Sequence, residues 1–174
     1  MTSSKKKLLS PEVLEKAKKA VLAAAKKEGK EVALVGGYAL QFYGSLRLTG
    51  DIDVITFEPI DALPVIKSLS FGGYKSEIKG VPVDVIIRDD EFAPMYEEAL
   101  YHSSKGIVPA EFIAAMKLAS GRHKDLSDLE FLITEEVIDV KATRKIIVRT
   151  LGVYAAKEFD LFVDETNWKK SREE

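Results

Sequence analysis

The chain contains no cysteine, only two histidines and a single tryptophan among its 174 residues. Without cysteine, disulfide bonds and cysteine-ligated zinc are excluded, and His102 and His123 are too few for most zinc sites. No apolar run approaches the roughly 20 residues that a membrane-spanning helix requires. The chain also lacks a strong charge of either sign: its net charge is −2, so a nucleic-acid partner would need a local basic patch. We therefore expect a cytoplasmic protein that does not enter a membrane.

The chain does contain enough apolar sequence for a core. Hydrophobic residues make up 46% of it and charged residues 31%, which indicates a folded protein with a well-solvated surface. A single domain is expected at this length. We predict a flexible N-terminus at residues 1–9, a core at residues 10–133, and a helical extension at residues 134–174 that belongs to the same domain.

Turn residues and hydrophobic periodicity place the strands before residue 90 and a run of helices after it. Ser10-Pro11-Glu12 is a helix start, with serine as N-cap, proline in the first turn and an acid beside it. The pattern predicts an α+β fold: a mixed sheet with helices on one face, followed by C-terminal helices. The predicted helices cover residues 10–29, 38–43, 61–69, 92–102, 109–120 and 126–133, with one or two more between 140 and 170, and the predicted strands cover residues 31–35, 51–57, 74–78 and 81–87.

Three aspartates stand out because of where they lie in the predicted strands. Asp51 and Asp53 are two residues apart, so in an extended strand they point to the same face, about 7 Å apart. Carboxylates on one face repel each other unless one is protonated or a cation lies between them, and hard oxygen ligands favour Mg²⁺ or Mn²⁺. Asp84 interrupts the otherwise apolar run at residues 81–87, where a carboxylate is costly unless it is paired, metal-bound or exposed. The glycine pair Gly36-Gly37, upstream of Asp51, allows backbone N–H groups to approach a phosphate.

The stretch from Val35 to Ile55, VGGYALQFYGSLRLTGDIDVI, resembles the motif of the nucleotidyltransferase superfamily, which has a polymerase-β-like fold: a strand, Gly-Gly, a short helix and Arg-x-Thr-x-Asp-Ile-Asp. The Gly-Gly form and the stretch Met116 to Leu129, MKLASGRHKDLSDL, are similar to the AbiEii-type toxin and minimal nucleotidyltransferase branch, which includes components of toxin–antitoxin systems. The resemblance covers about residues 30–133. Gly37 departs from the commoner pattern, which has serine at this position and hence one more hydroxyl contact to phosphate.

The resemblance implies an enzyme that moves a nucleoside monophosphate from an NTP to an acceptor hydroxyl, with Mg²⁺ or Mn²⁺ as cofactor. The acceptor would be tRNA or another RNA, a protein or a small molecule, and a toxin would have an antitoxin protein as partner. The residues that match the motif are Asp51, Asp53 and Asp84 as catalytic metal ligands, and Gly36, Gly37, Arg47, Lys117 and Asp125 as nucleotide-binding residues.

Simpler interpretations stay open for several of these residues. Asp51 and Asp53 could cap a strand and face solvent, and Gly36-Gly37 could form only a turn. Arg47 could be a surface ion-pair partner, and Lys117 could be a solvated helix lysine. At the level of function, the alternative is a catalytically silent nucleotidyltransferase-like module that binds a nucleotide or a protein partner.

A basic helix face is the remaining feature that bears on the acceptor. Lys141, Arg144, Lys145 and Arg149 recur at a spacing of three to four residues. Such a face tilts the prediction toward RNA, although a solvated face is the default interpretation. The two histidines are expected to be surface residues, and Tyr38 is expected to pack in the core.

Overall fold

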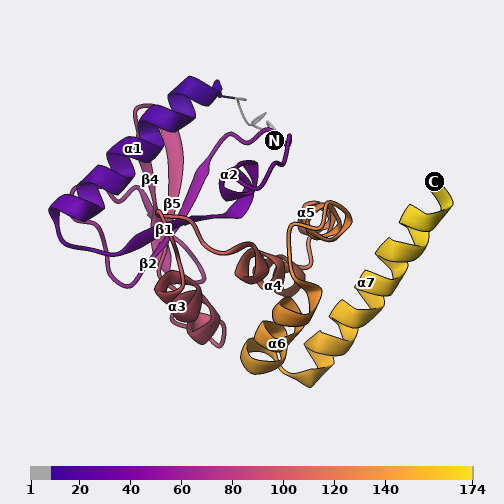
Figure 1. Ribbon diagram of the computed structural model, residues 1–174. Coiled ribbons are helices and arrows are strands. Elements are labelled where there is room, and N and C mark those ends of the chain that lie inside the picture. The colour runs from indigo at the N-terminus through magenta and orange to yellow at the C-terminus, as the bar shows by residue number, and fades with distance from the viewer. Residues whose placement is uncertain (1–8, 174) are drawn as a thin grey trace, which may run out of the picture. The chain divides into compact units, whose positions relative to one another are not determined.

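The computed structural model describes residues 9–173 (Figure 1). The predicted flexible segment at residues 1–9 lies, apart from Leu9, outside the described residues. Backbone contacts divide the chain into two compact units, one ending at Val108 and the other beginning at Pro109. The predicted division into a core at residues 10–133 and a helical extension at residues 134–174 stays a prediction. No helix in the described part of the chain combines the length and the apolarity that are needed to cross a bilayer.

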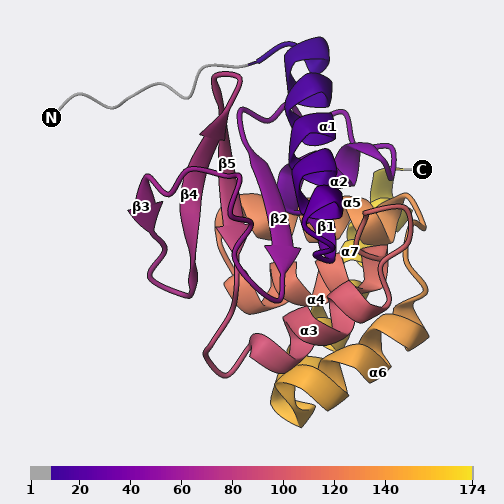
Figure 2. The ribbon, with the colours of Figure 1, turned by 90° about the vertical axis from the view of Figure 1, so that its left-hand side faces the viewer.

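In its described residues, 9–108, the first unit contains a five-stranded mixed sheet and three helices. The strands lie in the order β1-β2-β5-β4-β3, and Figure 2 shows β3, β4, β5 and β2 side by side. Among the five named strands, β2 and β5 pair in parallel, and the other neighbouring strands pair antiparallel. The elements are α1 (Pro11–Lys27), β1 (Val32–Val35), α2 (Gly36–Gln41), β2 (Ile52–Thr56), β3 (Lys67–Ser68), β4 (Gly73–Ile78), β5 (Val81–Ile86) and α3 (Ala93–Tyr101).

Helix α1 covers one face of the sheet. It begins as predicted, with the Ser10 hydroxyl accepting a hydrogen bond from the Val13 N–H at 3.4 Å and with Pro11 in the first turn. Its buried face contacts β4 and β5. Alternate residues of these two strands are buried, including Tyr74 and Ser76 in β4 and Val83 and Val85 in β5. Because strand side chains alternate between faces, the intervening residues of β4 and β5 point to the opposite face of the sheet.

The predicted helix at residues 61–69 is wrong. This segment is a loop that ends in β3, and Pro64 lies within it and cannot donate the backbone hydrogen bond of a helix interior. The Glu28 carboxylate, at the end of α1, instead accepts hydrogen bonds from the N–H groups of Asp61 and Ala62 at 2.9 and 2.8 Å. The N–H groups of Ile66 and Leu69, which a helix would use internally, donate to the carbonyls of Lys75 and Gly73 at 2.9 and 3.0 Å, so pairing with β4 replaces the helix.

Between residues 109 and 173 the second unit contains four helices, and the predicted region from 140 to 170 forms two of them. Helix α4 contacts α5 and α6, and α7 contacts α4, α5 and α6. The Asp139 carboxylate caps α6 by accepting a hydrogen bond from the Ala142 N–H at 2.9 Å. The bounds are α4 (Ala110–Ser120), α5 (His123–Thr134), α6 (Val140–Leu151) and α7 (Val153–Glu173). The predicted α+β class, a mixed sheet with helices and then C-terminal helices, is confirmed.

A buried ion-pair network joins α4 to α5. The Lys117 ammonium lies 2.8 Å from a carboxylate oxygen of Asp125 and 2.8 Å from one of Asp128, and all three side chains are buried. Asp125 also accepts hydrogen bonds from the Ser120 hydroxyl at 2.8 Å and from the Arg122 guanidinium at 2.6 Å. Burial alone would raise the pKa of Asp125, but the hydrogen bonds from Lys117, Arg122 and Ser120 outweigh it and lower that pKa to about 2.

This network predicts that the second unit loses stability in acid. The pKa of Asp125 is lower in the folded state than its ordinary value of 3.8, so its contribution is complete above about pH 4 and is lost as the pH falls toward 2. The shift corresponds to about 2 kcal/mol. We expect Asp125→Asn to reduce the free energy of unfolding by about that amount at pH 7, and by less at pH 2.5, in urea unfolding followed by circular dichroism.

Asp160→Asn is the matched control, because Asp160 pairs with Arg144 on an exposed surface, at 2.8 Å. An exposed pair contributes about 1 kcal/mol or less, so this variant should change stability little. Equal losses for the two variants would contradict the assignment of the stabilisation to the buried network.

Candidate active site

Two of the predicted metal ligands lie side by side in the sheet. Asp53 in β2 is the direct register partner of Asp84 in β5, and these strands are parallel. Partners in adjacent strands point to the same face, and neighbouring strands are about 4.8 Å apart. Both carboxylates therefore lie on the face of the sheet opposite α1. A motif in one strand and a lone aspartate 31 residues later thus meet because of the β2–β5 register.

The cross-strand row, or rung, of register partners that contains Asp53 and Asp84 extends across all five strands. Val35 pairs with Asp53 on one side, and Lys75 pairs with Asp84 on the other. Lys67 in β3 is in turn the partner of Lys75. The row therefore reads, from β1 to β3, apolar, acidic, acidic, basic, basic. The Lys75 ammonium lies 3.0 and 3.3 Å from the two carboxylate oxygens of Asp84.

Gly36 makes room for the Asp53 carboxylate. Its backbone has a φ of +69°, in the left-handed region that favours glycine, and a Cβ at this position would overlap with an Asp53 carboxylate oxygen. Gly36 follows β1 directly and begins α2. The first glycine of the pair is therefore required by both its backbone conformation and the acidic side chain of the neighbouring strand.

Gly37 makes room for Arg47 in a comparable way. A Cβ on Gly37 would overlap with a guanidinium nitrogen of Arg47 and would lie 3.6 Å from the Thr49 hydroxyl. The loop that carries Arg47 is fastened to α2, because the Gln41 amide donates a hydrogen bond to the Arg47 carbonyl at 3.0 Å. The guanidinium thus takes the space that the serine of the commoner motif would use, which explains the glycine at this position.

Asp51 lies just before β2 and is held by the same loop. Its carboxylate accepts a hydrogen bond from the buried Thr49 hydroxyl at 2.9 Å. The structure therefore gathers Gly36, Gly37, Arg47, Asp51, Asp53 and Asp84 within the first unit.

Asp51, Asp53 and Asp84 are the residues that could hold a divalent metal ion. All three offer the oxygen ligands that Mg²⁺ and Mn²⁺ prefer, and the space left free by Gly36 accommodates one of them. Among residues 9–173, however, no group of three acidic or histidine side chains already surrounds a common point suited to a metal ion. Asp84 faces Lys75 and Asp51 faces Thr49, so binding through all three carboxylates requires these side chains to turn.

Lys117 and Asp125 belong to the second unit, in the buried network described above. Lys117 is thus not the solvated helix lysine of the simpler interpretation, since it is only 7% exposed. Their predicted role in nucleotide handling stays a prediction. The network gives them a structural role in joining α4 to α5.

Lys75 is the residue of the site that the sequence analysis missed. Polar and buried residues alternate along its strand, so a lysine there gives no sequence signal by itself. Its contact with Asp84 depends on the register of the hairpin formed by β4 and β5. The predicted hairpin at residues 74–78 and 81–87 contained the signal, because pairing across the Lys79-Gly80 turn places Lys75 opposite Asp84.

The expectations for the aromatic and histidine residues are confirmed. Tyr38 is buried, its ring packs edge-on against Phe42 at a centroid distance of 5.6 Å, and its hydroxyl donates to the Glu15 carboxylate at 3.2 Å. Burial and the negative charge of Glu15 raise the pKa of Tyr38 to about 12, so it stays a donor. Both His102 and His123 are exposed.

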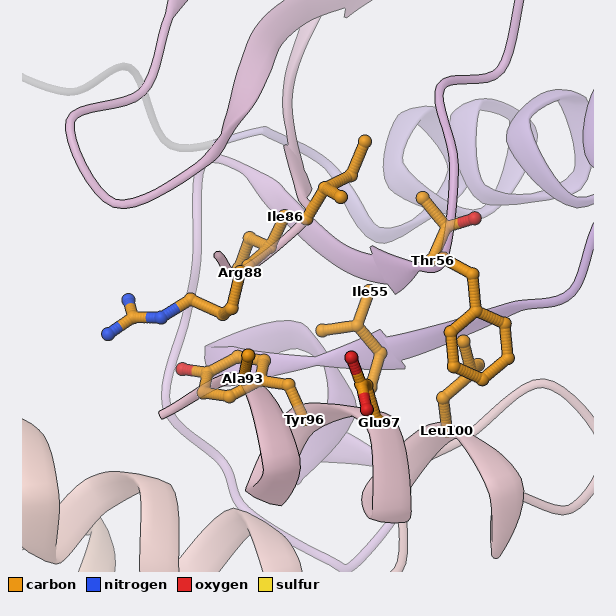
Figure 3. A pocket seen from close by; sticks show the side chains of 10 residues that line it. Ile55, Thr56, Ile86, Arg88, Ala93, Tyr96, Glu97 and Leu100 are labelled. Carbon is orange, nitrogen blue, oxygen red and sulfur yellow. The ribbon is translucent and has the colours of Figure 1, made fainter. Parts of the chain in front are cut away.

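A small pocket lies where β2 and β5 end against α3 (Figure 3). Its volume is about 40 Å³, which suits one or two water molecules and is far below the several hundred Å³ of a typical ligand site. Arg88 at its rim is held by Asp90 at 2.9 Å and lies over the rings of Phe71, Phe92 and Tyr96 at about 5 Å. The pocket is therefore a packed junction that is too small for a drug-sized ligand as it stands.

Comparisons with solved structures agree with this fold. Three structures each superpose with a TM-score of 0.51: JHP933 from Helicobacter pylori at 19% identity, a protein from H. pylori assigned as a nucleotidyltransferase at 20%, and the antibiotic-resistance factor ANT(2'')-Ia at 14%. The matches cover 95%, 95% and 94% of this chain and 96%, 99% and 96% of the respective structures. No protein-family model and no curated protein matches the sequence. At these identities the likeness establishes the fold alone: the chain has a nucleotidyltransferase-like fold.

Proposed function

We propose that this protein is a metal-dependent nucleotidyltransferase that moves a nucleoside monophosphate from an NTP to an acceptor hydroxyl. The observation that carries the proposal is the register of β2 with β5, which sets Asp53 beside Asp84 on one face of the sheet. The nucleotidyltransferase-like fold and the Gly-Gly and Asp-Ile-Asp motif support it. Asp51, Asp53 and Asp84 would hold Mg²⁺ or Mn²⁺, which would neutralise charge on the phosphates and on the attacking and leaving oxygens.

The residues of the chain would have distinct roles in that reaction. Asp53 and Asp84 would orient the reacting groups, and Asp84 would also be placed to accept the proton of the attacking hydroxyl. Arg47 would contact the phosphates through its guanidinium, which lies over Gly37. In this reaction the acceptor oxygen would form a bond to the α-phosphorus of the NTP. The bond between the α-phosphorus and the oxygen that bridges the α- and β-phosphates would break, and pyrophosphate would leave.

The acceptor class is the finer part of the proposal. The exposed basic residues of α6, among them Lys141 and Lys145, favour an RNA over a small molecule. Arg144 contributes less to such a surface, because it is paired with Asp160. Membership of the AbiEii-type branch, and with it a toxin role and an antitoxin partner, is also proposed on the motif at residues 116–129.

A silent nucleotide-binding or partner-binding module is the second candidate. The observation that favours it is the ion pair between Asp84 and Lys75, which engages the third carboxylate within the protein. Such a module would bind an NTP without releasing pyrophosphate.

The first prediction from the proposed function is that Asp53→Asn abolishes nucleotidyl transfer. The protein would be incubated with each α-labelled NTP, Mg²⁺ or Mn²⁺, total RNA and cell lysate, and label would be followed on RNA and protein bands. Loss of a residue that only hydrogen-bonds a metal ligand reduces activity by up to about 100-fold. Loss of the metal ligand Asp53 itself should therefore reduce transfer by at least about 100-fold. Asp164→Asn, an exposed aspartate of α7, is the control. Equal labelling by Asp53→Asn and the unmodified protein would refute the proposal, and NTP binding without label or pyrophosphate would favour the silent module.

The second prediction concerns Gly37→Ala. The added Cβ meets the Arg47 guanidinium, so the variant should raise the Kd for NTP, measured by calorimetry, about tenfold or more. Arg47→Ala should have a similar effect, and Gly37→Ala should add little in the Arg47→Ala background. Fully additive effects of the two substitutions would show that the glycine does not act through Arg47.

A further inference from the structure

Lys75 contacts Asp84 directly in the row across the sheet. It is the direct cross-strand partner of Asp84, and its ammonium contacts both oxygens of that carboxylate, at 3.0 and 3.3 Å. The Asp84 side chain is 20% exposed, whereas that of Lys75 is 49% exposed. The contact is thus bidentate at the carboxylate, and the lysine side chain has access to water.

The position of Lys75 matters because of what lies on the other side of Asp84. In the order of the strands, Asp53 precedes Asp84 and Lys75 follows it. Two adjacent carboxylates repel each other, and a positive charge beyond one of them draws that carboxylate away from the other. A metal ion shared by Asp53 and Asp84 needs the opposite orientation, so Lys75 and the metal ion compete for the same carboxylate.

We propose that Lys75 is a built-in counter-ion of Asp84 that competes with the divalent metal ion and thereby sets the metal affinity of the site. This inference rests on the proposed function, because it takes Asp84 as a metal ligand. In the absence of metal, the positive charge of Lys75 offsets the repulsion between the two carboxylates. When the metal binds, the half-exposed ammonium moves into water at low cost, since exposed ion pairs contribute little.

The test is Mn²⁺ binding by Lys75→Met, which keeps the length of the side chain and removes its charge. Titration of the free Mn²⁺ signal by electron paramagnetic resonance needs no catalytic turnover. We expect the Kd for Mn²⁺ to fall about two- to fivefold, the range that corresponds to an exposed ion pair. Lys75→Arg should retain the original Kd, because it retains the charge.

Two further variants separate competition from a general charge effect or a structural effect. Lys67→Met removes the next lysine of the row, one strand farther from Asp84, and should change the Kd less than Lys75→Met. In an Asp84→Asn background, Lys75→Met should no longer tighten Mn²⁺ binding. An ion pair that only stabilises the sheet would lower the melting temperature of Lys75→Met and leave its Kd unchanged, which would overturn the inference, as would weaker binding.

The outcomes also separate this inference from the proposed function. Mn²⁺ binding that requires Asp53 but is indifferent to Lys75 would overturn the inference and leave the metal-dependent function in place. Absence of Mn²⁺ binding in the unmodified protein, with and without NTP, would overturn both.

Discussion

The parallel pairing of β2 with β5 is the constraint on which the proposed site depends. It sets Asp53 beside Asp84, and the antiparallel neighbours on either side add Val35 and Lys75 to the same rung. A shift of one residue in this register would turn Asp84 toward the buried face under α1, where an unpaired carboxylate is costly. The apolar residues that alternate with the aspartates therefore fix the site, because their burial fixes the register.

The glycine pair adds a second constraint, which acts through space rather than through hydrogen bonds. Gly36 leaves room for the Asp53 carboxylate, and Gly37 leaves room for the Arg47 guanidinium. One turn between a strand and a short helix thus positions an acidic and a basic group that come from different parts of the chain. The glycine at position 37, where the commoner motif has serine, is accounted for by this packing.

Much of the fold could be predicted from the sequence, because its signals are local. The cap at Ser10, the apolar strand before Gly36 and the turn at Gly80 correspond to observed elements. The helix predicted at residues 61–69 failed because Pro64 lies within it and because the N–H groups of Ile66 and Leu69, which a helix would use internally, donate to the carbonyls of Lys75 and Gly73 in β4. Local propensity does not contain such a tertiary hydrogen bond.

In the candidate site, too, local sequence signals identified some residues, and others depend on tertiary structure. The glycine pair, the Asp-x-Asp spacing and the interrupted apolar run around Asp84 together indicated the three aspartates, whereas Lys75 became visible only through strand register. The direct test of the account is a crystal structure with Mn²⁺ and a non-hydrolysable NTP, in which anomalous scattering locates the metal. The account predicts a Mn²⁺ ion bound by carboxylate oxygens of both Asp53 and Asp84, with Lys75 turned away. A nucleotide complex in which Mn²⁺ lies elsewhere would contradict it.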